Sequence, residues 1–196
     1  DADLETLEST TDARQTAVAG LLGARVDLTA TDVTVRDFAG FGVVLVAGSG
    51  QWRGGALSGN VGTSLLIEGG ELSLVDLEIT DVRRAQSAGP ALVSTAVVIS
   101  ASAHVTSDGV RIEDIDGVGI LQDGATAVHT NLRVTRSQDP AVWVQNVVDP
   151  ARAAVVIHGA VIEQASGIGI FASASVGAEL EDVVVRDTLG RLQPSG

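Results

Sequence analysis

The feature that most constrains the fold is an eleven-residue phrase that returns along the chain at nearly equal intervals. It reads Val-Arg-Ile-Glu-Asp-Ile-Asp-Gly-Val-Gly-Ile at 110–120 and recurs at 33–43, at 160–170 and, more loosely, at 132–142. Less similar copies begin at Gly55, Leu77 and Val183. We call the first residue of each copy its anchor, and successive anchors lie 22, 22, 33, 22, 28 and 23 residues apart: Val33, Gly55, Leu77, Val110, Leu132, Ala160 and Val183. A unit this short cannot bury its apolar face alone, so the copies must stack on one another.

Within each copy, apolar and polar residues alternate with the two-residue period of a strand. Val, Ile, Leu and Thr dominate these stretches, and β-branched residues favour strands. Two residues after the anchor lies a column of apolar residues: Val35, Leu57, Ile79, Ile112, Val134, Ile162 and Val185. We therefore expect an all-β parallel solenoid of seven to eight rungs, with about 22 residues per rung and these residues stacked in its core.

The recurring phrase V-x-I-x-D-x-x-G-x-G-I resembles the right-handed parallel β-helix repeat of pectate-lyase-like proteins, over about residues 24–191. This resemblance implies a right-handed coil. The Lys-free composition, rich in Val, Ala, Arg and Asp, is similar to that of secreted bacterial members, which implies an extracellular or cell-surface location. The chain itself contains no targeting signal. Because this fold carries lyases, hydrolases, epimerases and adhesins, the resemblance does not select an activity.

The chain is expected to form one domain over residues 1–196, with 1–23 as a degenerate first rung or an N-terminal segment. A helix is expected, if anywhere, near 11–22. The two long intervals predict loops near 83–93, which contains Gly89-Pro90, and near 146–151, which contains Asp149-Pro150. Neither end of the chain reads as a cap for an open solenoid, so we expect a segment of a longer exported or surface protein.

Charge restricts the partners. The sequence has 12 Lys and Arg residues, all Arg, against 25 Asp and Glu, for a net charge of −13. This argues against nucleic acid and anionic membrane as partners, since both favour basic surfaces. The absence of Cys excludes disulfides and Cys-ligated zinc. No apolar run is long enough for membrane insertion.

Three acidic residues are the candidates for catalysis: Asp81, Asp114 and Asp116. Two carboxylates one rung apart could raise the pKa of one of them and act as acid and base. The alternative is an exposed charge ladder in which Glu78 pairs with Arg111 and Asp114 with Arg136. The catalytic sets of the resembled family, such as Asn-Thr-Asp and Gly-His-Gly, are missing. We therefore expect a non-catalytic structural or binding module, and keep as the alternative a carbohydrate-active enzyme (polysaccharide lyase, hydrolase or epimerase) with an atypical carboxylate site.

Two outward surfaces are candidates for binding. One is a charged face made by Glu78, Arg111, Arg133 and Arg136. The other, eleven residues after the anchors, is an apolar stripe formed by Val44, Leu66, Ile99, Leu121, Trp143 and Phe171. Exposed apolar patches usually mark an interface, unless a bend turns the column into the core or another segment covers it. The expected partners are another protein, the rest of a longer chain, or a polysaccharide.

The histidines and glycines read as structural. His129 falls in an inward column and is expected to be neutral and hydrogen-bonded to Ser107 one rung away. His104 and His158 fall outside any metal-ligand spacing, so neither a metal site nor a cofactor is expected. The Gly-x-Gly sequences at 117–119 and 167–169 are interpreted as tight turns.

Overall fold

The computed structural model describes residues 6–8, 19–84, 94–146, 153–173, 177–188 and 190. These residues form parallel strands of a single sheet, and no helix occurs among them. The strands are β1 (Thr6–Glu8), β2 (Ala19–Ala24), β3 (Asp27–Thr31), β4 (Thr34–Arg36), β5 (Ala39–Arg53), β6 (Ala56–Ser58), β7 (Val61–Val75), β8 (Glu78–Val82), β9 (Ser94–Ser100), β10 (His104–Asp108), β11 (Arg111–Ile115), β12 (Gly117–Asp123), β13 (Thr126–Ser137), β14 (Val142–Gln145), β15 (Ala153–Glu163), β16 (Ile170–Ala172) and β17 (Gly177–Arg186). The all-β prediction is confirmed. The helix expected near 11–22 is wrong for residues 19–22, which lie in β2, while 11–18 fall outside the described residues.

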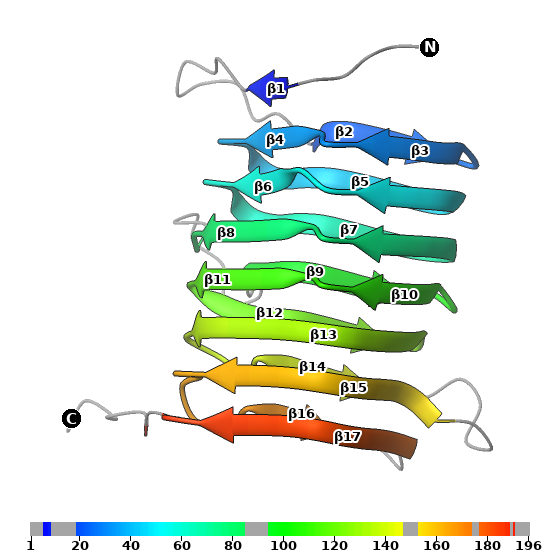
Figure 1. Ribbon diagram of the computed structural model, residues 1–196. Helices are drawn as coiled ribbons and strands as arrows, with labels where there is room; N and C mark the ends of the chain where they lie inside the picture. The colour runs from blue at the N-terminus through cyan, green and yellow to red at the C-terminus, as the bar shows by residue number, and fades with distance from the viewer. Residues whose placement is uncertain are drawn as a thin grey trace.

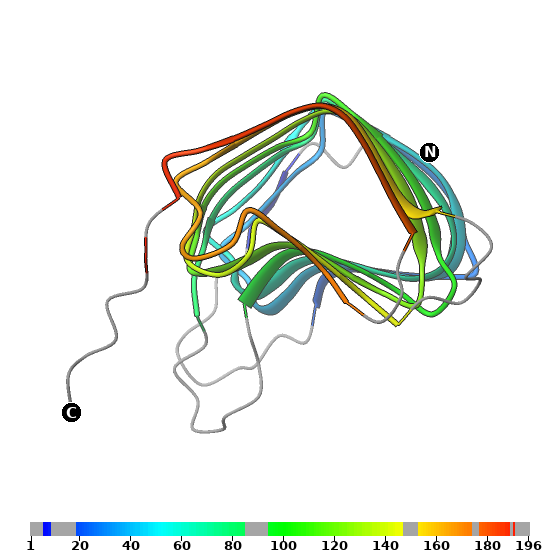
Figure 2. The same cartoon turned by 90° about the horizontal axis from the view of Figure 1, so that it is seen from below.

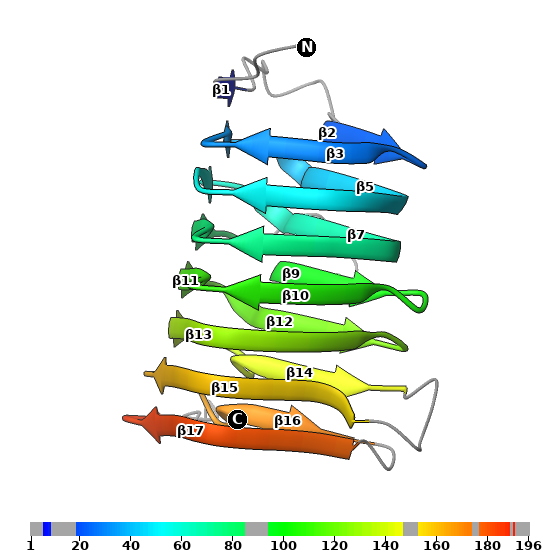
Figure 3. The same cartoon turned by 45° about the vertical axis from the view of Figure 1, so that its right-hand side comes forward.

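The strands are arranged in layers stacked one on the next, from β2, β3 and β4 at one end to β16 and β17 at the other (Figures 1 and 3). Strands of neighbouring layers pair in parallel, and the predicted column is confirmed residue by residue: Val35 pairs with Leu57, then Ile79, Ile112, Val134, Ile162 and Val185 follow in turn. The interval of the sequence repeat, which is 22 residues where nothing is inserted, is therefore the spacing between paired residues in adjacent layers.

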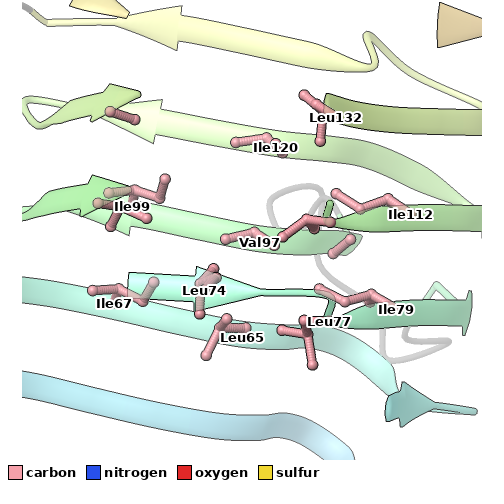
Figure 4. Close-up of a cluster of buried hydrophobic side chains, with 14 of the residues drawn as sticks. Leu65, Ile67, Leu74, Leu77, Ile79, Val97, Ile99, Ile112, Ile120 and Leu132 are labelled. Atoms are coloured by element: carbon pink, nitrogen blue, oxygen red, sulfur yellow. The ribbon is translucent and has the colours of Figure 1, made fainter. Parts of the chain in front are cut away.

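The core lies inside the stack. Viewed from the end, the strands of each layer surround a common interior (Figure 2), and buried aliphatic side chains from successive layers meet there (Figure 4). Leu57, Ile79 and Val134 have no exposed surface, and Ile112 has 1%. Each such Val, Leu or Ile contributes about 1.5–3 kcal/mol by leaving water, which is what the alternation in the sequence makes possible.

One member of the predicted apolar stripe is misplaced. Ile99 pairs with Ile67 and Gln122, is fully buried and belongs to the core cluster (Figure 4). Val98 takes its place, between Leu66 and Leu121. The cause is one extra residue in the turn after β9, where Ala101 and Ser102 both have positive φ, 53° and 64°. Counting from the anchors placed that residue on the wrong side of the strand.

Only part of each predicted loop belongs to the described residues. Arg83 forms an isolated bridge with Val61, and Asn146 follows β14, whereas 85–93 and 147–151 lie outside the described residues. Residues 6–8 form β1, which pairs with β4 beyond the first full layer, so that Leu7 is the partner of Val35.

Two columns of left-handed turns separate the short strands. The first lies four residues after the anchors, and the second lies one residue before them. Their members with positive φ are Asp37, Gly59, Asp81, Asp114, Arg136, Gln164 and Asp187 in the first, and Asp32, Gly54, Asp76, Gly109, Asn131, Gly159 and Asp182 in the second. Gly, Asn and Asp tolerate this conformation best. Backbone geometry alone therefore accounts for the Asp that recurs four residues after the anchors.

The Gly-x-Gly at 117–119 is not a turn, contrary to the interpretation from sequence. Both glycines lie in or at the start of β12, and neither has positive φ. A Cβ at Gly117 would lie 2.0 Å from the carbonyl oxygen of Ser94, and one at Gly119 would lie 2.4 Å from that of Ala141. These glycines allow neighbouring layers to approach closely. Gly167, by contrast, has φ of 86° and is a turn residue as predicted.

Candidate functional site

The candidate carboxylates Asp81 and Asp114 do lie on adjacent layers. Asp81 lies in β8 and Asp114 in β11, and the flanking pairs Glu113–Thr80 and Ile115–Val82 place the two carboxylates in one column. Each one, however, is held by its own arginine. Arg83 Nε donates to Asp81 Oδ1 at 3.0 Å, and a terminal guanidinium nitrogen of Arg136 donates to Asp114 Oδ2 at 2.9 Å. The pair predicted between Asp114 and Arg136 is therefore present.

These arginines determine the protonation of both groups. The hydrogen bond from Arg83 lowers the pKa of Asp81 below its ordinary value, and the hydrogen bond from Arg136 does the same for the pKa of Asp114. The mutual repulsion of the two carboxylates opposes this only as the smallest contribution at Asp81. A general acid near neutral pH needs a raised pKa, so the arrangement favours two ionised carboxylates.

Asp116 is held in the same way. The backbone amide of Arg84 donates to its Oδ2 at 3.3 Å, and the Arg84 guanidinium lies 3.8 Å from it and 3.3 Å from Asp139. In the described part of the chain, no group of three or more His, Asp or Glu side chains is placed to hold a metal ion.

The residues of the predicted charged face differ in their contacts: Arg133 and Arg136 form ion pairs, whereas Glu78 and Arg111 form none with each other. Glu78 and Arg111 are partners in register, as expected from their column, yet no ion pair joins these two described residues. Arg133 instead binds Glu163 at 3.0 Å, and Arg186 Nε donates to the same carboxylate at 2.6 Å. These arginines lower the pKa of Glu163, chiefly through the hydrogen bond from Arg186.

A shallow groove runs along the stack beside this face. It consists of two adjoining hollows, of about 460 and 580 Å³, that share Glu78, Gly109 and Arg111. The remaining lining residues come from five successive layers: Thr34, Gly55, Ala56, Asp76 and Leu77 in the first hollow, and Ile112, Glu113, Asn131, Arg133 and Thr135 in the second. Arg136, the fourth member of the predicted charged face, does not line the groove and lies with Asp114 and Glu113.

Sequence reasoning missed Asp76 and Asn131 at this groove. Both belong to the second turn column, one residue before the anchors, and that column was not considered as a lining. Its periodic Asp, Asn and Gly residues were the available signal. This column precedes the anchors by one residue, and the outward residues Glu78, Arg111 and Arg133 follow them by one, so both columns line the same groove.

The apolar stripe, with Val98 in place of Ile99, runs along one face through β5, β7, β9, β12, β14 and β16. Its side chains are not free in water: Val44 is buried, and Leu66, Leu121, Trp143 and Phe171 are half-buried. Trp143 and Phe171 stack edge to face, with ring centroids 5.6 Å apart and an interplanar angle of 89°. The indole Nε1 of Trp143 is buried without a hydrogen-bond partner among the described residues.

The predicted environment of His129 is confirmed. The ring is 2% exposed, and its Nδ1 lies 2.7 Å from Ser107 Oγ in the neighbouring layer. Burial lowers the pKa of His129 to about 4, because the charged imidazolium would lose its hydration. His104 lies 2.8 Å from Thr126 Oγ1, and His158 lies 2.9 Å from Glu181, both at the surface.

Comparison of the chain with models of protein families, with curated proteins and with solved structures finds no match. Among the described residues there is no helix with the length and apolar character needed to cross a membrane.

Proposed function

We propose that this chain is a right-handed parallel β-helix that serves as a non-catalytic binding module of a secreted or cell-surface bacterial protein. The fold part of the proposal is supported by the parallel pairing of each layer with the next at a spacing near 22 residues. It is supported also by the common interior that the layers surround (Figure 2). A right-handed path is the general rule for parallel crossover connections.

The observation that carries the non-catalytic assignment is the state of the carboxylates. Asp81, Asp114 and Asp116 each contact an arginine, and the pKa values of the first two are lowered by those contacts. Glycoside cleavage needs one carboxyl group that stays protonated near neutral pH. The alternative, a carbohydrate-active enzyme, has in its favour only that Asp81 and Asp114 lie on adjacent layers.

The proposed binding surface is the groove over Glu78, Arg111 and Arg133. Five layers at about 4.8 Å each give it a length of about 20 Å, enough for several units of an extended polymer laid along the stack. The groove is lined by the guanidinium groups of Arg111 and Arg133, the carboxylates of Asp76, Glu78 and Glu113, the Asn131 amide and the hydroxyls of Thr34 and Thr135. These groups suit a polysaccharide that is rich in hydroxyls and carries few carboxylates. Arg111 is its centre, since it lines both hollows and forms no ion pair with another described residue.

Titration calorimetry with neutral polysaccharides and with a sparsely acidic one, such as highly esterified pectin, tests this proposal. Replacement of Arg111 by Ala should weaken binding about tenfold, as expected for the loss of one charge-assisted contact. Arg25→Ala is the matched control, because Arg25 is also an exposed arginine but does not line the groove. Equal affinities for the two variants, or no binding of acidic or neutral polysaccharides by the native chain, would contradict the proposal.

A further inference from the structure

Three charged side chains that line the groove differ from the other charges around it. At the edge of the groove, Arg133 and Glu163 neutralise each other in an ion pair of 3.0 Å. Asp76, Glu78 and Arg111 are exposed in the hollows, and none of the three forms an ion pair with another described residue. These three groups are therefore available to a ligand.

The two acidic residues belong to one layer and to both columns that line the groove. Asp76 lies in the turn column one residue before the anchor, and Glu78 lies one residue after it. A Cβ built at Gly109 would lie 2.4 Å from Asp76 Oδ1, so this carboxylate lies over the glycine of the next layer. That layer contains Arg111, the register partner of Glu78. Arg111 therefore has acidic neighbours from both columns on one side along the stack.

On its other side, Arg111 adjoins groups that already have partners. Arg133 is its register partner there, and the charge of Arg133 is compensated by Glu163. The side-chain amide of Asn131 donates to Asp108 Oδ1 at 2.9 Å. Of the two guanidinium groups in the groove, that of Arg111 is thus the one whose charge no described carboxylate compensates.

We propose that Asp76 and Glu78 are specificity-determining residues, which restrict the groove to a polysaccharide whose carboxylated sugars stand singly between uncharged ones. This inference rests on the proposed function. A single carboxylate binds the Arg111 guanidinium through charge-assisted hydrogen bonds. The uncharged neighbouring sugars offer hydroxyl groups, which donate hydrogen bonds to the carboxylates of Asp76 and Glu78.

A polymer with a carboxylate on every sugar fits this arrangement poorly. Layers lie about 4.8 Å apart, close to the advance of one sugar in an extended 1,4-linked chain. When one carboxylate is bound at Arg111, the next one along a filled groove therefore reaches the layer of Asp76 and Glu78. It meets an acidic side chain whichever column it faces. Like charges about 5 Å apart near a protein surface weaken binding by about tenfold or more.

Two polymers with the same backbone test the inference: polygalacturonate, which is charged on every sugar, and highly esterified pectin, which has few free carboxylates. Titration calorimetry is performed at one ionic strength, because salt screens like-charge repulsion. We expect the native chain to bind the esterified polymer at least about tenfold more tightly. Glu78→Gln keeps the size of an exposed side chain and should reduce this preference about tenfold, by strengthening the binding of polygalacturonate.

Glu68→Gln is the matched control, because Glu68 is also exposed and its replacement changes the net charge equally, but it lines neither hollow. It should leave the preference unchanged. Arg111→Ala added to Glu78→Gln should abolish the gained binding of polygalacturonate, since the ligand carboxylate then lacks its partner.

The outcomes separate this inference from the proposed function. Equal affinity of the native chain for both polymers, or equal effects of Glu78→Gln and Glu68→Gln, would overturn the inference and leave the binding groove standing. A gain that survives the loss of Arg111, or no binding of polygalacturonate by Glu78→Gln, would overturn it as well. If the native chain binds neither polymer and no neutral polysaccharide, the proposed function fails together with the inference.

Discussion

The buried imidazole of His129 makes a defined prediction for the acid stability of the chain. His129 lies inside the stack in one column with Trp52, Leu74 and Ile157, and Ser107 is its only hydrogen-bond partner among the described residues. Because burial lowers its pKa to about 4, the folded state binds a proton less readily than the unfolded chain, in which the pKa is about 6.5. Protonation must therefore favour unfolding.

The magnitude follows from this difference. Above about pH 6.5, His129 is neutral in both states and costs nothing. Between pH 6.5 and about 4 only the unfolded chain takes up the proton, so the free energy of unfolding falls by about 1.4 kcal/mol for each pH unit. The total loss reaches about 3 kcal/mol and ceases below pH 4. Asp81 and Asp114, whose pKa values are lowered, lose their contribution only below their ordinary value of 3.8, outside this window. Glu163, whose pKa is also lowered, begins to lose its contribution near its ordinary value of 4.5, at the acid end of the window.

The assay is urea unfolding from about pH 7 to pH 4, followed by the tryptophan fluorescence, to which Trp52 and Trp143 both contribute. The comparison variant is Ser107→Ala/His129→Leu, which replaces both hydrogen-bonding partners by apolar groups and should remove the loss between pH 6.5 and 4. His104 and His158 remain in both chains, so the difference between the two curves belongs to His129. Parallel curves over this interval would refute the reasoning, since a buried neutral imidazole cannot be silent there.

Three further predictions follow from the core, the carboxylates and the stripe. Ile112→Ala should cost about 2–5 kcal/mol in urea unfolding, against less than about 0.5 kcal/mol for the exposed control Val184→Ala. We expect no turnover of pectin, alginate or polygalacturonate in assays for reducing or unsaturated ends; product release that disappears in Asp114→Asn would instead make Asp81 and Asp114 an acid–base pair. In a Trp52→Phe background, Trp143 should emit at short wavelength and resist acrylamide quenching, because its indole nitrogen is buried, and a red-shifted, freely quenched emission would contradict this.

The layered architecture could be predicted because strand pairing repeats what the sequence repeats. Partners such as Ile79 and Ile112 are separated by one period plus an insertion, and the insertion is accommodated between strands without disturbing their register. What the period could not predict is which turn holds each extra residue. Because of the additional residue at 101–102, counting back from Val110 predicts the wrong side of the strand for Val98 and Ile99. A one-residue error in register always has this effect, since successive side chains point to opposite sides of a strand.

The candidate site was predictable only where contacts stay within one column. Asp114 and Arg136 lie 22 residues apart at the same position of the repeat, so their contact could be anticipated. The contact of Arg84 with Asp139 spans 55 residues and crosses an insertion, and that of Arg133 with Glu163 joins different columns. The groove likewise depends on how two neighbouring columns meet at a corner, which spacing alone does not describe.

The glycines of the recurring phrase give the sharpest test of what the repeat encodes. A turn glycine with positive φ is replaced best by Asn, whereas a glycine that permits close approach tolerates no side chain. Gly119 lacks positive φ, and a Cβ there would lie 2.4 Å from the Ala141 carbonyl oxygen and 3.0 Å from Val134. Gly119→Ala should therefore cost about 1–3 kcal/mol, and Gly119→Asn more.

Gly167 is the matched comparison, because it has φ of 86° and nothing lies within 4 Å of a Cβ built there. Gly167→Ala should cost about 1–2 kcal/mol, and Gly167→Asn less than Gly167→Ala. Urea unfolding of the four variants measures the order of the two substitutions at each position. If Asn is better tolerated than Ala at Gly119 as well, the phrase encodes a turn at 117–119, and the close approach of β12 to its neighbouring layers is wrong. The opposite orders expected here mean that one motif serves two purposes: it bends the chain at Gly167 and lets layers touch at Gly119.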